Sequence, residues 1–251
     1  MSASSIAHSR STDDSSDAMV IPAAGSGSRM AGTVEDKILE TVAGATILAH
    51  SLRAIRRDSR IRRLVVATRD AAQEERIAAI LAEEGWDKEQ GGICVPGGAT
   101  RAESVHQAVA ALPEPVNWVF VHDAARPLIR TEWLAQLRQS AENHGAAALA
   151  RPLTDTLQRA PRGLDPTANP TLLEPVDRTL HWTMETPQCF RHRDLVHALE
   201  SARRSGLHHT DEVSAARAVG IGVALVVPDA PNPKVTTPQD LAWIEFLLTA
   251  C

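Results

Sequence analysis

Residues 19–30, MVIPAAGSGSRM, place a short apolar run directly before a loop of mostly small residues. Such a run is typical of a strand buried on both faces, and a loop without bulky side chains lets backbone N–H groups point at a phosphate. The predicted cradle consists of Ala23, Ala24, Gly25 and Gly27. Met30 stands where the dinucleotide fingerprint needs its third glycine, and the Walker loop's Gly-Lys-Ser/Thr is absent, so both of these loops are excluded. The glycines alone are equally consistent with a tight turn that only relieves strain.

The rest of the chain alternates short apolar runs with longer helical patterns. The predicted strands are 19–23, 64–68, 93–96, 118–122, 146–150 and 223–228, all expected to be buried on both faces. The predicted helices are 46–57, 71–84, 101–112, 131–144, 193–205, 211–219 and 237–250. This alternation predicts an α/β fold with a mostly parallel, doubly wound sheet, whose ligands bind at the carboxyl ends of the strands.

Residues 153–186 interrupt this alternation. They are rich in proline and glycine and contain two extended stretches, DTLQRA (155–160) and TLLEPVDRT (171–179). Two such stretches around a polar tip predict a β-hairpin arm that leaves the body of the protein.

Composition limits the domain organisation and the class of partner. Residues 1–18 are rich in serine and aspartate, so we expect a disordered tail of which 1–17 can be removed without loss, and a single domain over 19–251. A net charge of −5 gives no general attraction for nucleic acid, and no apolar segment is long enough to cross a membrane. The three cysteines fit neither a disulfide framework nor a zinc site, which indicates a cytoplasmic protein.

A set of motifs in fixed order gives the chain a family resemblance. The motifs are PAAGSGSRM (22–30), GGATRAESV (97–105), VHDAARP (121–127), DTL (155–157), VDR (176–178), TPQ (186–188), TDE (210–212) and KVTTPQDL (234–241). Together they closely resemble the 2-C-methyl-D-erythritol 4-phosphate cytidylyltransferase family. The resemblance implies a Rossmann-like nucleotidyltransferase that joins CTP to methylerythritol phosphate with Mg²⁺, giving CDP-methylerythritol and pyrophosphate in non-mevalonate isoprenoid biosynthesis. It also implies a homodimer whose hairpin arms clasp each other.

The resemblance assigns roles to particular residues. Arg29 and Lys37 match catalytic cations that grip the triphosphate, and Lys234 matches a catalytic lysine near the acceptor phosphate. The nucleotide would be held by the small-residue loop and by Gly98, Arg101 and Ser104, with the backbone of Ala23 and Gly98 reading cytosine. Arg126 matches the substrate-phosphate arginine, and Thr156 and Arg178 match arm residues that reach the acceptor across the dimer.

Two aspartates are candidate metal ligands. Asp123 follows the strand 118–122, where a carboxylate can hold Mg²⁺ and help to bind substrate, although an aspartate there could instead cap a following helix. Asp211, at a predicted helix start, fits a metal or substrate carboxylate as well as it fits a cap.

Some positions depart from the family pattern. Lys37 is flanked by Asp36 and Ile38 where the family has proline and glutamine, and Gln158 replaces a lysine of the arm motif. The alternatives are therefore a cytidylyltransferase for another polyol phosphate, such as ribitol 5-phosphate, and a catalytically silent CTP-binding homologue.

Overall fold

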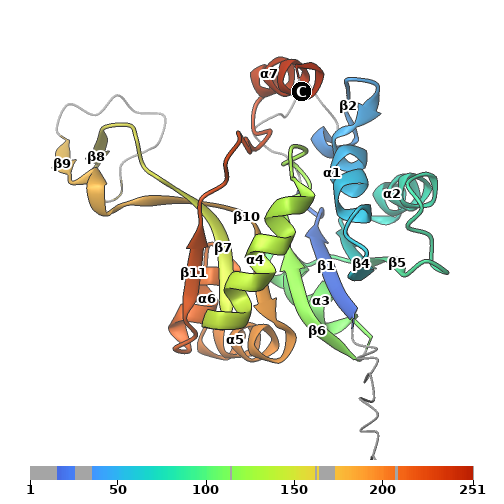
Figure 1. Cartoon of the computed structure of the whole chain (residues 1–251), viewed down its shortest axis with the longest axis horizontal. Coiled ribbons are helices and arrows are strands. Elements are labelled where there is room, and N and C mark those ends of the chain that lie inside the picture. The colour runs from blue at the N-terminus through green and yellow to red at the C-terminus, as the bar shows by residue number, and fades with distance from the viewer. Residues whose placement is uncertain are drawn as a thin grey trace, which may run out of the picture.

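The structure, a computed structural model, describes residues 16–25, 36–113, 115–161, 163, 173–206 and 209–250. Its centre is a seven-stranded sheet with the order β11-β7-β10-β6-β1-β4-β5 (Figure 1). The strands are β1 (Ser16–Pro22), β4 (Ile61–Thr68), β5 (Gly92–Pro96), β6 (Val116–Val121), β7 (Ala146–Pro152), β10 (Trp182–Arg191) and β11 (Val223–Val226). Neighbouring strands run parallel except at β10, which is antiparallel to β6 and β7. The predicted mostly parallel α/β sheet is confirmed.

Helices cover both faces of this sheet (Figure 1). They are α1 (Ile47–Arg56), α2 (Ala71–Glu83), α3 (Arg101–Ala110), α4 (Thr131–His144), α5 (His192–Ser205), α6 (Glu212–Ala218) and α7 (Pro238–Thr249). Met19 and Ile21 of β1 pack with α1, α2 and α4, whereas Ala18 and Val20 pack with α3, α5 and α6. Alternate residues of one strand thus face two cores, as a doubly wound sheet requires. Within the described ranges, no helix is long and apolar enough to span a bilayer.

Strand β10 was not predicted from the sequence. Its stretch WTMETPQCFR has no continuous apolar run, because Glu185, Thr186 and Gln188 are polar yet buried. Their polar atoms make hydrogen bonds to other elements, for example from Gln188 Nε2 to Asp211 Oδ2 at 3.0 Å. A strand that buries polar groups in this way has no hydrophobic periodicity to reveal it.

The structure corrects the predicted start of β1 and the predicted burial of β11. Strand β1 begins at Ser16, so the predicted disordered tail is too long by three residues, and residues 1–15 lie outside the described part. Asp17 is buried in β1 and pairs with Arg138, so we now expect that removing residues 1–17, unlike removing 1–15, disturbs the sheet. The edge strand β11 is only partly buried, with Leu225 42% exposed, because an edge strand has one neighbour.

The predicted arm contains a hairpin of β8 (Leu157–Arg159) and β9 (Glu174–Val176), paired antiparallel with Leu157 opposite Val176. Figure 1 shows this hairpin well away from the central sheet, on the connection between β7 and β10. Residues 182–186, predicted to belong to the arm, instead start β10, where Trp182 pairs with Pro152. The tip residues 164–172 lie outside the described part.

Candidate active site

A cavity of about 500 Å³ lies at the carboxyl ends of β1, β5 and β6. It brings together nine residues predicted for the site: Ala23, Ala24, Gly25, Lys37, Gly98, Arg101, Ser104, Asp123 and Lys234. These residues come from five separate stretches of the chain. Two predicted members, Gly27 and Arg29, lie outside the described residues.

The two loops that follow β1 and β5 touch each other on one side of this cavity. A Cβ atom on Gly97 would lie 2.4 Å from the Cβ of Ala24, and one on Gly98 would lie 2.2 Å from the Cβ of Glu103. Both positions therefore require glycine. The missing side chains let the 97–98 loop pack closely against Ala24 and against Glu103 of α3, which fixes the loop at the edge of the cavity.

Ser104 secures the second of these loops. Its Oγ accepts from Gly98 N at 3.1 Å and donates to Thr100 O at 2.9 Å, while Thr100 caps α3 in a reciprocal box with Glu103. The serine is 2% exposed. Since the N–H of Gly98 is already donated to Ser104, the serine orders the loop, and base recognition by that N–H stays a prediction.

Asp123 lies at the centre of a cluster of cations. Its Oδ1 accepts from Arg101 Nε at 3.1 Å and its Oδ2 from Lys234 Nζ at 2.7 Å, with Arg126 Nε 3.9 Å from Oδ2. Burial by itself would raise the pKa of Asp123, but the charges of Arg101 and Lys234 hold it well below its usual range. The next helix, α4, begins only at Thr131, so Asp123 does not cap a helix.

Glu212 completes this cluster from the first turn of α6. It is 2% exposed, and its two carboxylate oxygens accept from Arg101 Nη1 at 2.8 and 3.0 Å. Burial raises the pKa of Glu212, although Arg101 opposes that shift. Arg101 therefore links two carboxylates that are far apart in sequence. Glu212 is the last residue of the TDE motif, of which only Asp211 was predicted to belong to the site.

His122 supports the same loop from beneath. It is fully buried; its Nε2 lies 3.2 Å from Arg126 O and its Nδ1 3.2 Å from Thr186 Oγ1. Burial lowers the pKa of His122 to about 4, so the ring is neutral at pH 7. A buried neutral ring next to Asp123 fixes the loop without adding charge to the site.

A second cavity, of about 520 Å³, adjoins the first and shares Lys234 with it. Arg126 lines this second cavity; its Nη1 donates to Asn232 O at 2.6 Å. Within the described residues, Arg126 Nε and Asn232 Oδ1 are buried without a hydrogen-bond partner. Buried polar atoms without partners are rare, and their presence beside a cavity indicates that a ligand supplies the missing partners. Asn232, Arg151 and Trp243 also line this cavity, and none of them was predicted from the sequence.

Lys37 enters the first cavity from a short helix, η2 (Lys37–Leu39), and its Nζ donates to Val235 O at 3.0 Å. Asp36, the unusual residue before it, is buried and caps η2 through Ile38 N. The departure from the family pattern therefore has a structural role at Asp36, and the lysine still lies beside the segment that carries Lys234.

Comparison with known proteins agrees with this geometry. The family model of 2-C-methyl-D-erythritol 4-phosphate cytidylyltransferase (IspD) matches residues 18–250. The chain belongs to this family. A member from Thiobacillus denitrificans is 38% identical over 234 residues, covering 91% of this chain and 96% of its own, and one from Nitrosospira multiformis is 38% identical over 240 residues, covering 92% and 97%. The crystal structure of the cytidylyltransferase from Thermus thermophilus superposes with a TM-score of 0.73 at 32% identity, over 93% of this chain and 99% of that one.

Three residues predicted from the cytidylyltransferase resemblance lie outside both cavities. Thr156 and Arg178 are exposed on the arm, where Arg178 Nη1 donates to Thr154 O. Asp211 caps α6, with Oδ1 accepting from Ser214 N and Oδ2 from Gln188 Nε2, both at 3.0 Å. The carboxylate of Asp211 is thus engaged as the helix cap that the sequence left open as an alternative.

The fit of these residues to Mg²⁺ rests on Asp123. Across the described ranges, no group of three or more His, Cys, Asp or Glu residues could hold a metal ion by itself. Mg²⁺ commonly takes one or two carboxylates and completes its shell with water and substrate phosphates. A single buried carboxylate at the mouth of a phosphate-sized cavity fits that pattern, provided that the triphosphate brings the remaining oxygens.

Proposed function

We infer that this protein transfers the CMP group of CTP to 2-C-methyl-D-erythritol 4-phosphate and releases pyrophosphate. The observation that carries the inference is the pair of adjoining cavities that share Lys234. One cavity is lined by the small residues of two loops, as a nucleotide requires, and the other contains the half-buried Arg126. A nucleotide and a phosphorylated acceptor bound in these cavities would meet at Lys234.

The reaction needs no general base, because the nucleophile is an oxygen of the already ionised acceptor phosphate. A bond forms between this oxygen and the α-phosphorus of CTP, and the bond to the bridging oxygen breaks, so that pyrophosphate leaves with the electron pair. The barrier comes from bringing two anions together, and fixed cations lower it. Lys37, Arg101 and Lys234 are the predicted site cations that line the first cavity, Arg69 lines it as well, and Arg29 is proposed to act with them.

Mg²⁺ is proposed as the cofactor, and it would neutralise charge on the triphosphate when bound. Asp123 is the carboxylate that would hold it. Arg126 would hold the acceptor phosphate from the neighbouring cavity, with Asn232 bound to it.

A homodimer formed through the arms is also proposed. Leu173, Leu180 and Trp182 are 45%, 80% and 41% exposed on or beside the arm, and large apolar side chains gathered on a protrusion favour contact with another surface. Thr156 and Arg178 would then reach the acceptor cavity of the second copy. A cytoplasmic location is proposed as well, since both described cysteines, Cys94 and Cys189, are free thiols.

Pyrophosphate release tests the reaction. The protein is given CTP and Mg²⁺ with methylerythritol phosphate, with ribitol 5-phosphate or with no acceptor. We expect release only with methylerythritol phosphate. A preference for ribitol 5-phosphate would assign the protein to the other polyol phosphate, and CTP binding without turnover would show a silent homologue.

Mixed dimers test the shared site. Arg178→Ala and Asp123→Ala are each expected to be inactive, and mass measurement first establishes that exchanged dimers have formed. If Arg178 serves the partner's site, a mixed dimer has one site with both lesions and one with neither, so activity partly returns. No recovery in proven mixed dimers would refute the proposed role of the arm.

A further inference from the structure

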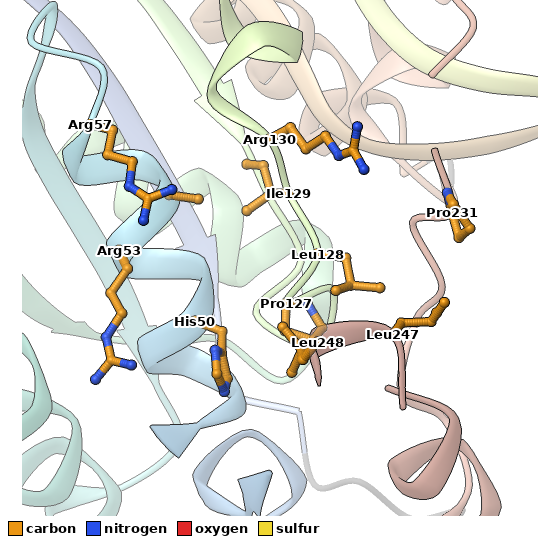
Figure 2. A pocket seen from close by; sticks show the side chains of 11 residues that line it. His50, Arg53, Arg57, Pro127, Leu128, Ile129, Arg130, Pro231, Leu247 and Leu248 are labelled. Carbon is orange, nitrogen blue, oxygen red and sulfur yellow. The ribbon is translucent and has the colours of Figure 1, made fainter. Parts of the chain in front are cut away.

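A third cavity, of about 490 Å³, lies between α1, residues 127–130 and the end of α7, and it shares Pro231 with the acceptor cavity. Figure 2 shows α1 on one side and the loop segment 127–130 on the other. The basic side chains that line it are His50, Arg53, Arg57 and Arg130, and none of its lining residues is acidic. In a chain with a net charge of −5, a cavity whose ionisable lining residues are all basic is a local reversal of the overall charge.

The positive charge of this cavity is only partly neutralised. Arg53 is paired with Glu84, with nitrogen–oxygen distances from 2.7 to 3.0 Å, and in Figure 2 its guanidinium is directed away from the segment 127–130. Arg130 has its carboxylate, Asp229, 3.8 Å away and 74% exposed, and such exposed pairs are worth little. The Arg57 side chain forms no hydrogen bond or ion pair with the residues that the structure describes.

The remaining lining residues are apolar. Leu128 and Ile129 come from the segment after β6, and Leu247 and Leu248 come from α7. In the view of Figure 2, Ile129 lies between Arg57 and Arg130. A site with apolar walls and cations at its rim selects a ligand that carries both an anionic head and an apolar chain.

The walls of this cavity also support the acceptor cavity. Pro127 directly follows Arg126, whose carbonyl oxygen accepts from Ser51 Oγ of α1 at 3.3 Å. Pro231 lines both cavities and precedes Asn232, the partner of Arg126. A ligand bound here would therefore lie directly behind the loops that carry Arg126 and Asn232.

We propose that the cavity between α1, residues 127–130 and α7 is a second ligand site, which binds a small amphipathic anion, a phosphate ester of an apolar chain. Its head group contacts Arg57 and Arg130, and its chain lies against Leu128, Ile129 and Leu248. The proposal does not depend on the activity of the protein.

Isothermal titration with hexyl phosphate, in the presence of saturating CTP, tests the site. We expect one equivalent to bind, and inorganic phosphate and hexanol each to bind at least tenfold more weakly. The double variant Arg57→Leu/Arg130→Leu is expected to weaken binding at least tenfold, whereas Arg62→Leu, at an exposed arginine of β4, leaves it unchanged. Melting temperatures of all variants establish that they are folded, and these surface changes leave the cores intact.

Several results would overturn the proposal. Equal binding of hexyl phosphate to the wild type and the double variant would show that Arg57 and Arg130 do not form the site. Loss of binding in Arg126→Ala but not in the double variant would place the ligand in the acceptor cavity. If inorganic phosphate bound as tightly as hexyl phosphate, the apolar chain would not contribute to binding. If the protein sedimented with phosphatidate vesicles but did not bind free hexyl phosphate, the surface would instead bind the head groups of a membrane.

Discussion

Replacing Glu212 by glutamine tests the ion-pair chain that organises the site. The substitution keeps the shape and one acceptor oxygen of the side chain but removes the charge that faces Arg101. Arg101 then remains, with its side chain 30% exposed, paired with Asp123 alone. We expect the variant to be less stable and also less active, because Arg101 and Asp123 line the cavity proposed for CTP.

The size of the effect follows from the burial of the pair. Removing one partner of a buried ion pair costs about 3–5 kcal/mol, and hydrogen bonds to a charged group contribute about 1.5–3 kcal/mol each. Since Arg101 keeps partial contact with water and glutamine keeps one acceptor, we expect a loss of about 2–3 kcal/mol, below the cost of removing a fully buried partner. For a chain of this size, that loss lowers the melting temperature by roughly 4–12 °C.

A double-mutant cycle with Arg101→Gln provides the assay, read by thermal and urea unfolding. In the double variant no unpaired charge is left between the two positions, so its loss should be smaller than the sum of the single losses by about 1–2 kcal/mol. Glu200→Gln is the matched control, because Glu200 and Arg204 form an exposed pair at 3.6 Å, and it should shift the melting temperature very little. Additive single effects, or a Glu212→Gln variant as stable as the wild type, would refute the proposed coupling.

Three further predictions concern pH, the N-terminus and catalysis. The folded protein holds His122 with its pKa near 4, so its contribution to stability is present above the unfolded value near 6.5 and is lost as the pH falls toward 4. That loss amounts to about 3 kcal/mol of the free energy of unfolding. The His122→Gln variant lacks the titrating ring, so its free energy of unfolding, measured in urea, should differ less between pH 7.5 and pH 4.5 than that of the wild type. Deleting residues 1–15 should leave the melting temperature unchanged. Deleting residues 1–17 should lower it, because Asp17 is lost from β1 and Arg138 loses that partner. Equal melting temperatures of the two truncated proteins would contradict the role of Asp17. Lys37→Ala should lower kcat for pyrophosphate release about a hundredfold, and a nearly unchanged rate would mean that another cation acts in its place.

The sequence alone predicted those strands whose buried residues form a continuous apolar run. Strands such as β4 and β6 are buried on both faces, and their apolar runs identify them directly. The carboxyl ends of these strands then predicted the position of Asp123. Strand β10 escaped detection because it buries polar residues, such as Thr186 and Gln188, that form hydrogen bonds with residues from other elements.

Some site residues could not be predicted from the sequence because, as in β10, only contacts between distant parts of the chain reveal them. Glu212 and Arg101 are 111 residues apart, as are Lys234 and Asp123, and only the fold makes each pair meet. A buried carboxylate in the first turn of a short helix resembles an ordinary helix terminus in sequence. Trp243 and Asn232 do not belong to a sequence motif that indicates a site. Packing alone brings them to the cavity that contains Arg126.

The pairing of Lys234 and Arg101 with Asp123 has a consequence for how tightly substrates are held. The protein carries its own counter-anion, so an arriving triphosphate exchanges one negative partner for another and does not meet bare positive charge. Part of the attraction for the ground state is thereby cancelled, whereas the extra negative charge that develops at the α-phosphorus has no such internal competitor. Interactions that strengthen only as the reaction proceeds raise turnover, and moderate ground-state affinity lets a highly charged product such as pyrophosphate leave. In this way a carboxylate among the cations limits product retention.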